Sequence, residues 1–130
     1  MTPRELETRT KKFAISAIQF IEPIATHGVS RILSAQLIRC ATSIGANYRE
    51  ANRAESKRDF IHKIAIIEKE AAESQYWLEL VHECSLGDPN EVRALLKEAG
   101  ELLAIFTRIG RTAKRSLNSQ FAIRNSQSPS

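Results

Sequence analysis

Apolar residues recur three or four positions apart along most of the chain, and no stretch alternates apolar and polar residues as a β-strand does. The last apolar stretch keeps the spacing most strictly, through Val92, Leu95, Ala99, Leu102 and Phe106. Since this spacing places side chains on one face of an α-helix, it predicts an all-α protein. The predicted helices span about residues 3–26, 31–55, 57–86 and 89–117.

Short breaks separate the predicted helices. Gly28 interrupts the chain between the first two, and Pro23 is expected to bend or loosen the last turn of the first. Ser56 is a candidate N-cap for the third helix. Asp88 followed by Pro89 is typical of a helix start and opens the fourth.

Helices of this length joined by short connections predict an up-down-up-down antiparallel four-helix bundle. The bundle forms one domain over residues 1–117. Residues 118–130 are rich in Ser, Asn and Gln and show no helical period, so they are predicted to form a disordered tail.

A polar stripe runs along the second predicted helix beside its apolar face, and carboxylates on the third helix are expected opposite it. The residues of this polar seam are Gln36, Arg39, Ser43, Asn47, Glu70 and Glu73. Buried polar atoms need hydrogen-bond partners, and Arg39 with Glu70 or Glu73 would form a charge-assisted pair. We interpret the seam as structural, fixing the register of neighbouring helices, with contact to a ligand as the alternative.

Composition limits the possible class of protein. A chain of 130 residues with 42% hydrophobic residues can bury one core without cross-links. No uncharged apolar run approaches the roughly 18–20 residues that span a bilayer, and the charged N-terminus lacks a signal-peptide pattern. A cytoplasmic protein without membrane contact is therefore expected. Cys40 and Cys84 have no paired spacing and are expected to be reduced and buried.

Catalytic patterns are weak in this sequence. Glu79 and His82 have the spacing used in di-metal helical bundles, but such a site needs a second copy on another helix. Asp59 and His62 resemble a copy, yet they lie on the same helix about 30 Å away. No phosphate-binding loop or cysteine–histidine cluster is present. We expect no enzyme activity, no metal and no cofactor.

Charge is arranged in blocks along the chain. Residues 1–63 hold 11 basic and 6 acidic residues, residues 64–101 hold 3 and 9, and residues 102–130 hold 5 and none. In the predicted topology the start of the first helix, the turn between the second and third, and the end of the fourth meet at one end. The residues expected to make this end basic are Arg49, Arg53, Lys57, Arg58, Lys63, Arg108, Arg111, Lys114 and Arg115.

A basic end of this kind is the electrostatic footprint of a protein that binds a phosphate backbone. The alternative is an ordinary solvated helix surface, because acidic residues dilute the patch. No aromatic residues are interleaved with the cations for base stacking.

Three apolar residues of the third helix, Ile66, Trp77 and Leu80, are turned away from its core stripe by roughly 90–150°. Aligned apolar side chains on one helix favour an interface, so we predict that they face another copy of the chain. The alternative is that a wide core stripe or the first helix covers them.

The segment from Gln36 to Leu80 also carries a resemblance, and its sequence is QLIRCATSIGANYREANRAESKRDFIHKIAIIEKEAAESQYWLEL. It resembles the signature segment of the four-helix-bundle family named for 23S rRNA intervening sequences. The resemblance is carried by Gln36, Leu37, Arg39, Ser43, Ile44, Asn47 to Ala51, Ser56, Asp59 to Ile61, Lys63, Glu70, Glu73 and Tyr76 to Glu79. The first and last helices match the family only in pattern.

The resemblance implies an antiparallel bundle that assembles into a ring-shaped homopentamer, encoded in bacterial genomes and in some cases inside the 23S rRNA gene. The family is similar to the accessory protein of diversity-generating retroelements, a basic pentameric ring that binds nucleic acid and a reverse transcriptase. The resemblance therefore implies RNA or DNA as a partner, and a protein partner such as a reverse transcriptase. It supplies no catalytic residues.

Two classes of function follow from the sequence. The first is a homo-oligomeric bundle that binds nucleic acid, with RNA favoured, through its basic end. The alternative is a protein-interaction scaffold whose charges serve solubility and orientation.

Overall fold

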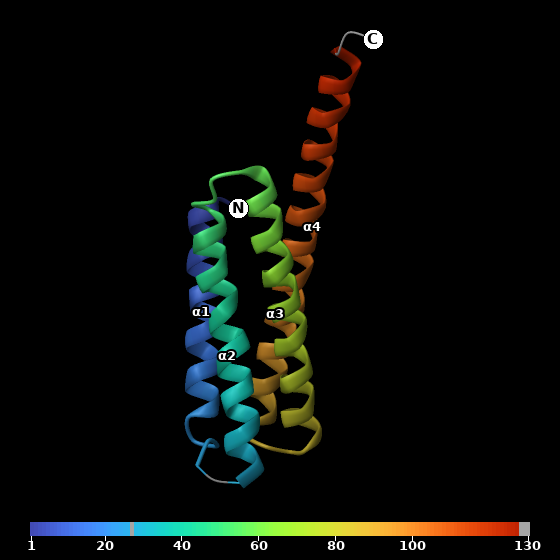
Figure 1. Ribbon diagram of the computed structural model, residues 1–130. Coiled ribbons are helices and arrows are strands. Elements are labelled where there is room, and N and C mark those ends of the chain that lie inside the picture. The colour runs from blue at the N-terminus through green and yellow to red at the C-terminus, as the bar shows by residue number, and fades with distance from the viewer. Residues whose placement is uncertain (27, 128–130) are drawn as a thin grey trace.

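The structure is a computed structural model that describes residues 1–26 and 28–127. Over these residues it consists of four α-helices, α1 (Pro3–Ile21), α2 (Gly28–Ala51), α3 (Lys57–Glu83) and α4 (Pro89–Gln127), and contains no strand. Figure 1 shows the α1–α2 and α3–α4 connections at one end and the α2–α3 connection at the other, so that consecutive helices run in opposite directions. The predicted all-α four-helix bundle is confirmed.

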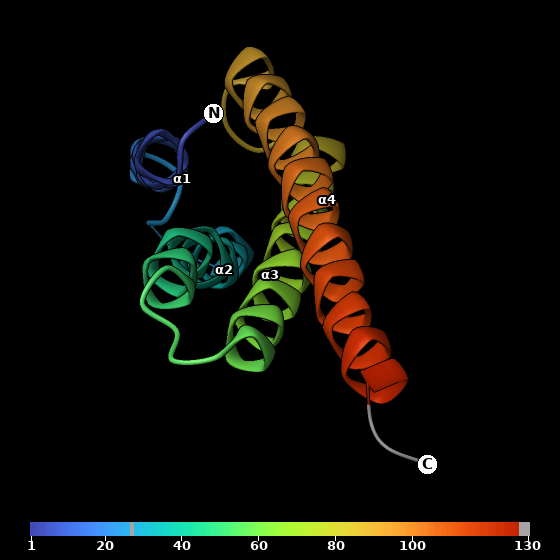
Figure 2. The same cartoon turned by 90° about the horizontal axis from the view of Figure 1, so that it is seen from above.

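Each helix packs against its neighbours in sequence, and α1 also contacts α4. Seen from above, α2 lies between α1 and α3, and α4 crosses α3 at an angle (Figure 2). The core lies between the four apolar stripes, and its largest fully buried side chains include Phe13, Leu37, Ile64 and Phe106.

Three helix starts are stabilised by side chains that accept hydrogen bonds from free backbone N–H groups. Thr2 caps α1 in a capping box with Glu5. Ser56 Oγ accepts from the Asp59 N–H at 3.0 Å at the start of α3. Asp88 Oδ1 accepts from the Asn90 N–H at 2.7 Å at the start of α4. The caps at Ser56 and Asp88 agree with the sequence prediction.

Several predicted helix bounds need correction. The first helix ends at Ile21 instead of near residue 26, because Pro23 has no N–H to donate and residues 22–26 form turns. The second begins at Gly28 instead of near residue 31 and ends at Ala51 instead of near residue 55. The third helix ends at Glu83 instead of near residue 86, and Ser85 just beyond it has a positive φ of 57°.

The fourth helix is longer than predicted. It continues to Gln127, past the end expected near residue 117, so residues 118–127 extend the helix instead of forming a separate tail. Figure 1 shows this part of α4 projecting beyond the α2–α3 connection. The last three residues of the predicted tail, 128–130, lie outside the described residues.

Small residues let α1 and α2 approach closely. A Cβ atom built on Gly45 would lie 3.2 Å from Thr10 Oγ1, so a larger residue there would require the Thr10 side chain to shift. Thr10 is fully buried, and its hydroxyl donates to the Glu7 carbonyl at 2.9 Å. The close contact between α1 and α2 at this position therefore depends on the absence of a side chain at Gly45.

The two cysteines differ in environment. Cys40 is buried, as predicted, whereas Cys84 is exposed at the C-terminal end of α3, so the prediction is wrong for Cys84. Both are free thiols. Across the described residues, none of the helices combines the length and apolar character needed to cross a membrane.

Candidate nucleic-acid interface

One end of the bundle holds the start of α1, the α2–α3 connection and the part of α4 that passes them (Figure 1). We call this the basic end. Arg53 lies in the α2–α3 connection, and Lys57 and Arg58 form the first turn of α3. The remaining cations follow α4 outward, and they are Arg108, Arg111, Lys114 and Arg115.

Two of the predicted basic-end residues have carboxylate partners. Arg49 Nε lies 3.9 Å from a carboxylate oxygen of Glu7 on α1, and Lys63 Nζ lies 3.4 Å from Glu50 on α2. These ion pairs link helices and reduce the positive charge available to a ligand. We therefore assign Arg49 and Lys63 to contacts within the bundle.

The other predicted basic-end residues carry uncompensated charge. Within the described side chains, Arg53, Lys57, Arg58 and the four cations of α4 form no ion pair. All of them are exposed except Lys57, which is half-buried and donates to Ser116 Oγ at 2.5 Å.

Glu101 is the last acidic residue of the chain, so every charged side chain of α4 beyond it is a cation. Glu55 and Asp59 are the acidic residues nearest in sequence to the first turn of α3.

An aromatic residue that the sequence interpretation placed in the tail lies among these cations. The ring centroid of Phe121 is 5.2 Å from the Arg58 guanidinium carbon and 6.0 Å from that of Arg124. The contact with Arg58 joins residues far apart in sequence, so local patterns could not show it. The four-residue spacing of Leu117 and Phe121 was the available signal, because it continues the helical period of α4.

Arg9 is a further cation that is neutralised. Its guanidinium donates to both carboxylate oxygens of Glu98 on α4, at 2.8 and 2.7 Å, and to Glu101 at 3.0 Å. The hydrogen bond with Glu98 raises the pKa of Arg9 above its already high value, so the pair stays ionised. Arg9 and Glu98 line a groove of about 630 Å³ between α1 and α4, together with Phe13 and Leu95.

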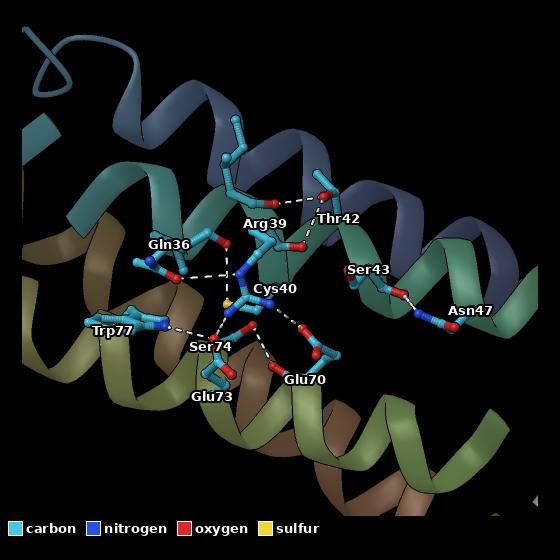
Figure 3. Close-up of polar contacts among 12 residues, drawn as sticks. Gln36, Arg39, Cys40, Thr42, Ser43, Asn47, Glu70, Glu73, Ser74 and Trp77 are labelled. Carbon is cyan, nitrogen blue, oxygen red and sulfur yellow. Dashed lines mark hydrogen bonds and ion pairs between the residues drawn. The ribbon is translucent and has the colours of Figure 1, made fainter. Parts of the chain in front are cut away.

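Arg39 is the centre of the polar seam between α2 and α3 (Figure 3). Its guanidinium lies 3.3 Å from Glu70 Oε2, forms a second ion pair with Glu73, and donates to Gln36 Oε1 at 3.4 Å. The Arg39 side chain is 48% exposed and that of Glu70 only 10% exposed. The seam therefore combines a largely buried carboxylate with a cation at the surface.

The outer members of the seam make different contacts. Asn47 Nδ2 donates to the Ser43 backbone carbonyl at 2.9 Å, so this pair lies within α2 and does not bridge to α3. Next to the seam, burial raises the pKa of the Cys40 thiol, which therefore stays protonated at neutral pH (Figure 3). The role of the seam in fixing register stays a prediction.

The predicted interface residues Ile66, Trp77 and Leu80 are all half-buried. Trp77 and Leu80 pack against the core, and Trp77 Nε1 donates to Glu73 Oε2 at 3.1 Å. This packing matches the wide-core alternative for those two residues, and the interface itself stays a prediction.

Two further apolar side chains are more than half exposed and were missed from sequence. Ile32 on α2 is 62% exposed and Tyr76 on α3 is 53% exposed. The Arg39–Glu73 contact sets an antiparallel register that places Ile32 level with Leu80. We call Ile32, Tyr76, Trp77 and Leu80 the apolar patch. It lies toward the end of the bundle opposite the basic end.

Among the described residues, no three His, Cys, Asp or Glu side chains come together as potential metal ligands. Glu79 and His82 thus lack the additional carboxylates that a metal pair would need.

Over the described residues, the fold is an all-α antiparallel bundle with a group of unpaired cations at one end. A comparison with models of protein families matches residues 6–108 to the 23S rRNA-intervening sequence protein. The chain belongs to this family, and the resemblance drawn from Gln36 to Leu80 is confirmed.

A crystal structure from Bacteroides thetaiotaomicron, described as a protein of unknown function from the S23 ribosomal protein family, has the same fold. It is 30% identical in sequence, with a TM-score of 0.78 over 85% of this chain and 99% of that chain. A comparison with curated proteins finds no match.

Proposed function

We propose that this protein is a non-enzymatic, cytoplasmic nucleic-acid-binding protein, with RNA as its expected ligand, and that it binds phosphates through the basic end. Cations of the α2–α3 connection, of the first turn of α3 and of α4 contact the nucleic-acid backbone with little dependence on base sequence. The contacting residues are Arg53, Lys57, Arg58, Arg108, Arg111, Lys114 and Arg115.

The observation that carries this proposal is the gathering, in the described part of the chain, of seven cations without ion pairs at one end of the bundle. Arg9, Arg39, Arg49 and Lys63 are each held by carboxylates within the bundle. The seven cations of the basic end form no ion pair within the described side chains. Unpaired like charges repel one another, so a group of them at one end does not stabilise the fold. Such a group favours the binding of an anionic ligand.

Family membership supports RNA as the form of nucleic acid. The family takes its description from an intervening sequence of 23S rRNA, and the structural relative belongs to a family described as ribosomal. Both descriptions concern proteins associated by name with ribosomal RNA.

We also propose that the chain self-associates, as the pentameric ring implied by the resemblance requires. The apolar patch supports this, because Ile32 and Tyr76 expose apolar area beside half-buried Trp77 and Leu80. Assembly would repeat the basic end in each subunit and raise overall affinity through multivalency.

The proposal can be tested by comparing two variants that lose the same charge. The first changes Arg53, Arg111, Lys114 and Arg115 to Gln at the basic end. The matched control changes Arg31, Lys69, Arg93 and Lys97 to Gln, all exposed and all outside the basic end. Binding to single-stranded RNA is measured over a range of salt concentrations.

For the first variant, log affinity against log salt should become shallower by up to about 3 units, since each lost phosphate contact removes about 0.7. The control variant should keep the slope of the parent protein. If the slope of log affinity against log salt falls equally in both variants, RNA binding depends on the net charge of the protein and not on a site at the basic end. If the parent does not bind at about 50 mM salt, a protein-interaction scaffold built on the apolar patch becomes the better account.

A further inference from the structure

Aromatic side chains could add base contacts to a phosphate-binding surface, so the position of each aromatic residue is informative. Phe13, Phe20, Tyr48 and Phe106 are buried in the core, and Phe60 packs against it. Tyr76 and Trp77 contact each other within the apolar patch, toward the end opposite the cations. Phe121 is thus the aromatic residue at the basic end that is outside the core.

Phe121 is held in position by two helices. Its ring lies 5.2 Å from the Arg58 guanidinium carbon on α3, and Arg124 lies one helical turn further along α4. The Lys57–Ser116 hydrogen bond of 2.5 Å ties the same part of α4 to the first turn of α3. The ring is half-buried, so part of its surface stays open to solvent.

The cations around the ring would bring a phosphate backbone close to it. Arg58 forms no ion pair within the described side chains, and Lys114 and Arg115 lie two turns or less before Phe121 on α4. An aromatic ring flanked by unpaired cations is the combination with which proteins bind single strands, because the cations hold phosphates and the ring stacks on a base.

We propose that Phe121, together with the Arg58 guanidinium, is a stacking site for an unpaired base, which makes the preferred ligand single-stranded or looped nucleic acid. This proposal rests on the proposed function and deepens it. A base in a duplex has both faces covered by its neighbours, whereas an unpaired base can stack on an aromatic ring or on an arginine plane.

The aromatic residue of the site lies outside the part of the chain that matches the family, whereas Arg58 lies within it. The family match ends at residue 108, whereas Phe121 lies on the projecting part of α4. The projecting part of α4, residues 118–127, would be only marginally stable in water as a separate helix. Its contact with Arg58 of α3 is made by Phe121, which lies near its start. The projecting helix therefore adds a base contact to a bundle that otherwise presents only phosphate contacts.

The test compares Phe121→Ala, Phe121→Leu and Phe121→Trp with Ile123→Ala, a control on the same segment. Ile123 is 57% exposed, so its replacement with Ala removes exposed apolar area but no aromatic ring. Affinity is measured at fixed salt for a single-stranded RNA and for a blunt RNA duplex of the same length. A single strand carrying 2-aminopurine reports stacking directly, because its fluorescence is quenched when the base stacks.

Phe121→Ala and Phe121→Leu should each weaken single-strand binding about 5- to 100-fold, the loss expected for one stacked base. Duplex binding and the salt slope should not change, because no phosphate contact is removed. Phe121→Trp should restore affinity and quenching, and Ile123→Ala should resemble the parent.

Phe121→Leu separates stacking from packing, since it keeps an apolar side chain against α3 without a π face. If Phe121→Leu binds and quenches like the parent, the stacking proposal is overturned while phosphate binding stands. Equal losses for single strand and duplex would also overturn it, because they would indicate a general disturbance of α4. If the parent binds neither RNA, the proposed function fails and the stacking site fails with it.

Discussion

At the scale of single residues, arginines on the helix surfaces of this protein have different partners. Arg39 joins α2 to two carboxylates of α3, and Arg9 joins α1 to two carboxylates of α4. Arg58 lies over an aromatic ring and forms no ion pair within the described side chains. Since the residue type is the same, the neighbouring helix decides whether an arginine stabilises the bundle or stays available to a ligand.

Replacing Arg39 with Ala should reveal the strength of the polar seam. The change leaves Glu70, with a side chain only 10% exposed, without its cation. Because Arg39 itself is about half exposed, we expect a loss of about 1–3 kcal/mol, between the values for surface and buried pairs. Thermal and denaturant unfolding measure it.

The matched control is Arg49→Ala. Arg49 is 56% exposed and lies 3.9 Å from Glu7, so its loss should cost only about 0–1 kcal/mol. If Arg39→Ala costs no more than Arg49→Ala, the seam does not stabilise the bundle, and its polar stripe becomes a candidate for ligand contact.

At the scale of elements, the sequence was sufficient for the number of helices, their order and the caps at Ser56 and Asp88. These features depend on local periodicity and on hydrogen bonds within a few residues. The extent of α4 was not predicted, because residues 118–127 are mostly polar and the spacing of Leu117 and Phe121 is a weak signal by itself. Their helix is supported by contacts with α3 at Lys57 and Arg58 that are distant in sequence.

The same distinction applies to the candidate site. The cations of the basic end were predictable as a group from charge blocks and topology. Which of them are neutralised was not, because Arg49 with Glu7 and Lys63 with Glu50 depend on how helices face one another. Phe121 was missed for the same reason, since only the packed structure brings it to Arg58.

At the scale of the whole molecule, the bundle has two distinct ends. The basic end carries unpaired cations on α3 and α4, and the apolar patch lies toward the other end on α2 and α3. This separation would allow copies of the chain to assemble through one surface while the other binds a ligand.

Self-association predicts that a charge placed in the apolar patch lowers the assembled mass. Ile32→Glu and Leu80→Glu should each reduce the mass measured by light scattering, because a carboxylate cannot be buried without a partner at an interface. Helical circular dichroism should be largely kept, especially for Ile32, which is 62% exposed.

Ile15→Glu is the control for this experiment, since Ile15 is 43% exposed on α1, outside the patch. Its mass should equal that of the parent. An unchanged mass for both patch variants would exclude this surface as the contact between copies.

The central claim, that the basic end binds nucleic acid, is tested most directly by hydrogen exchange of the parent protein with and without saturating single-stranded RNA. We predict slower exchange at residues 53–60 and 108–124, where the unpaired cations and Phe121 lie. Residues 28–32 and 84–93, at the opposite end, should exchange at the same rate in both states. Slower exchange at the opposite end alone, or no change at the basic end when RNA is bound, would contradict the account.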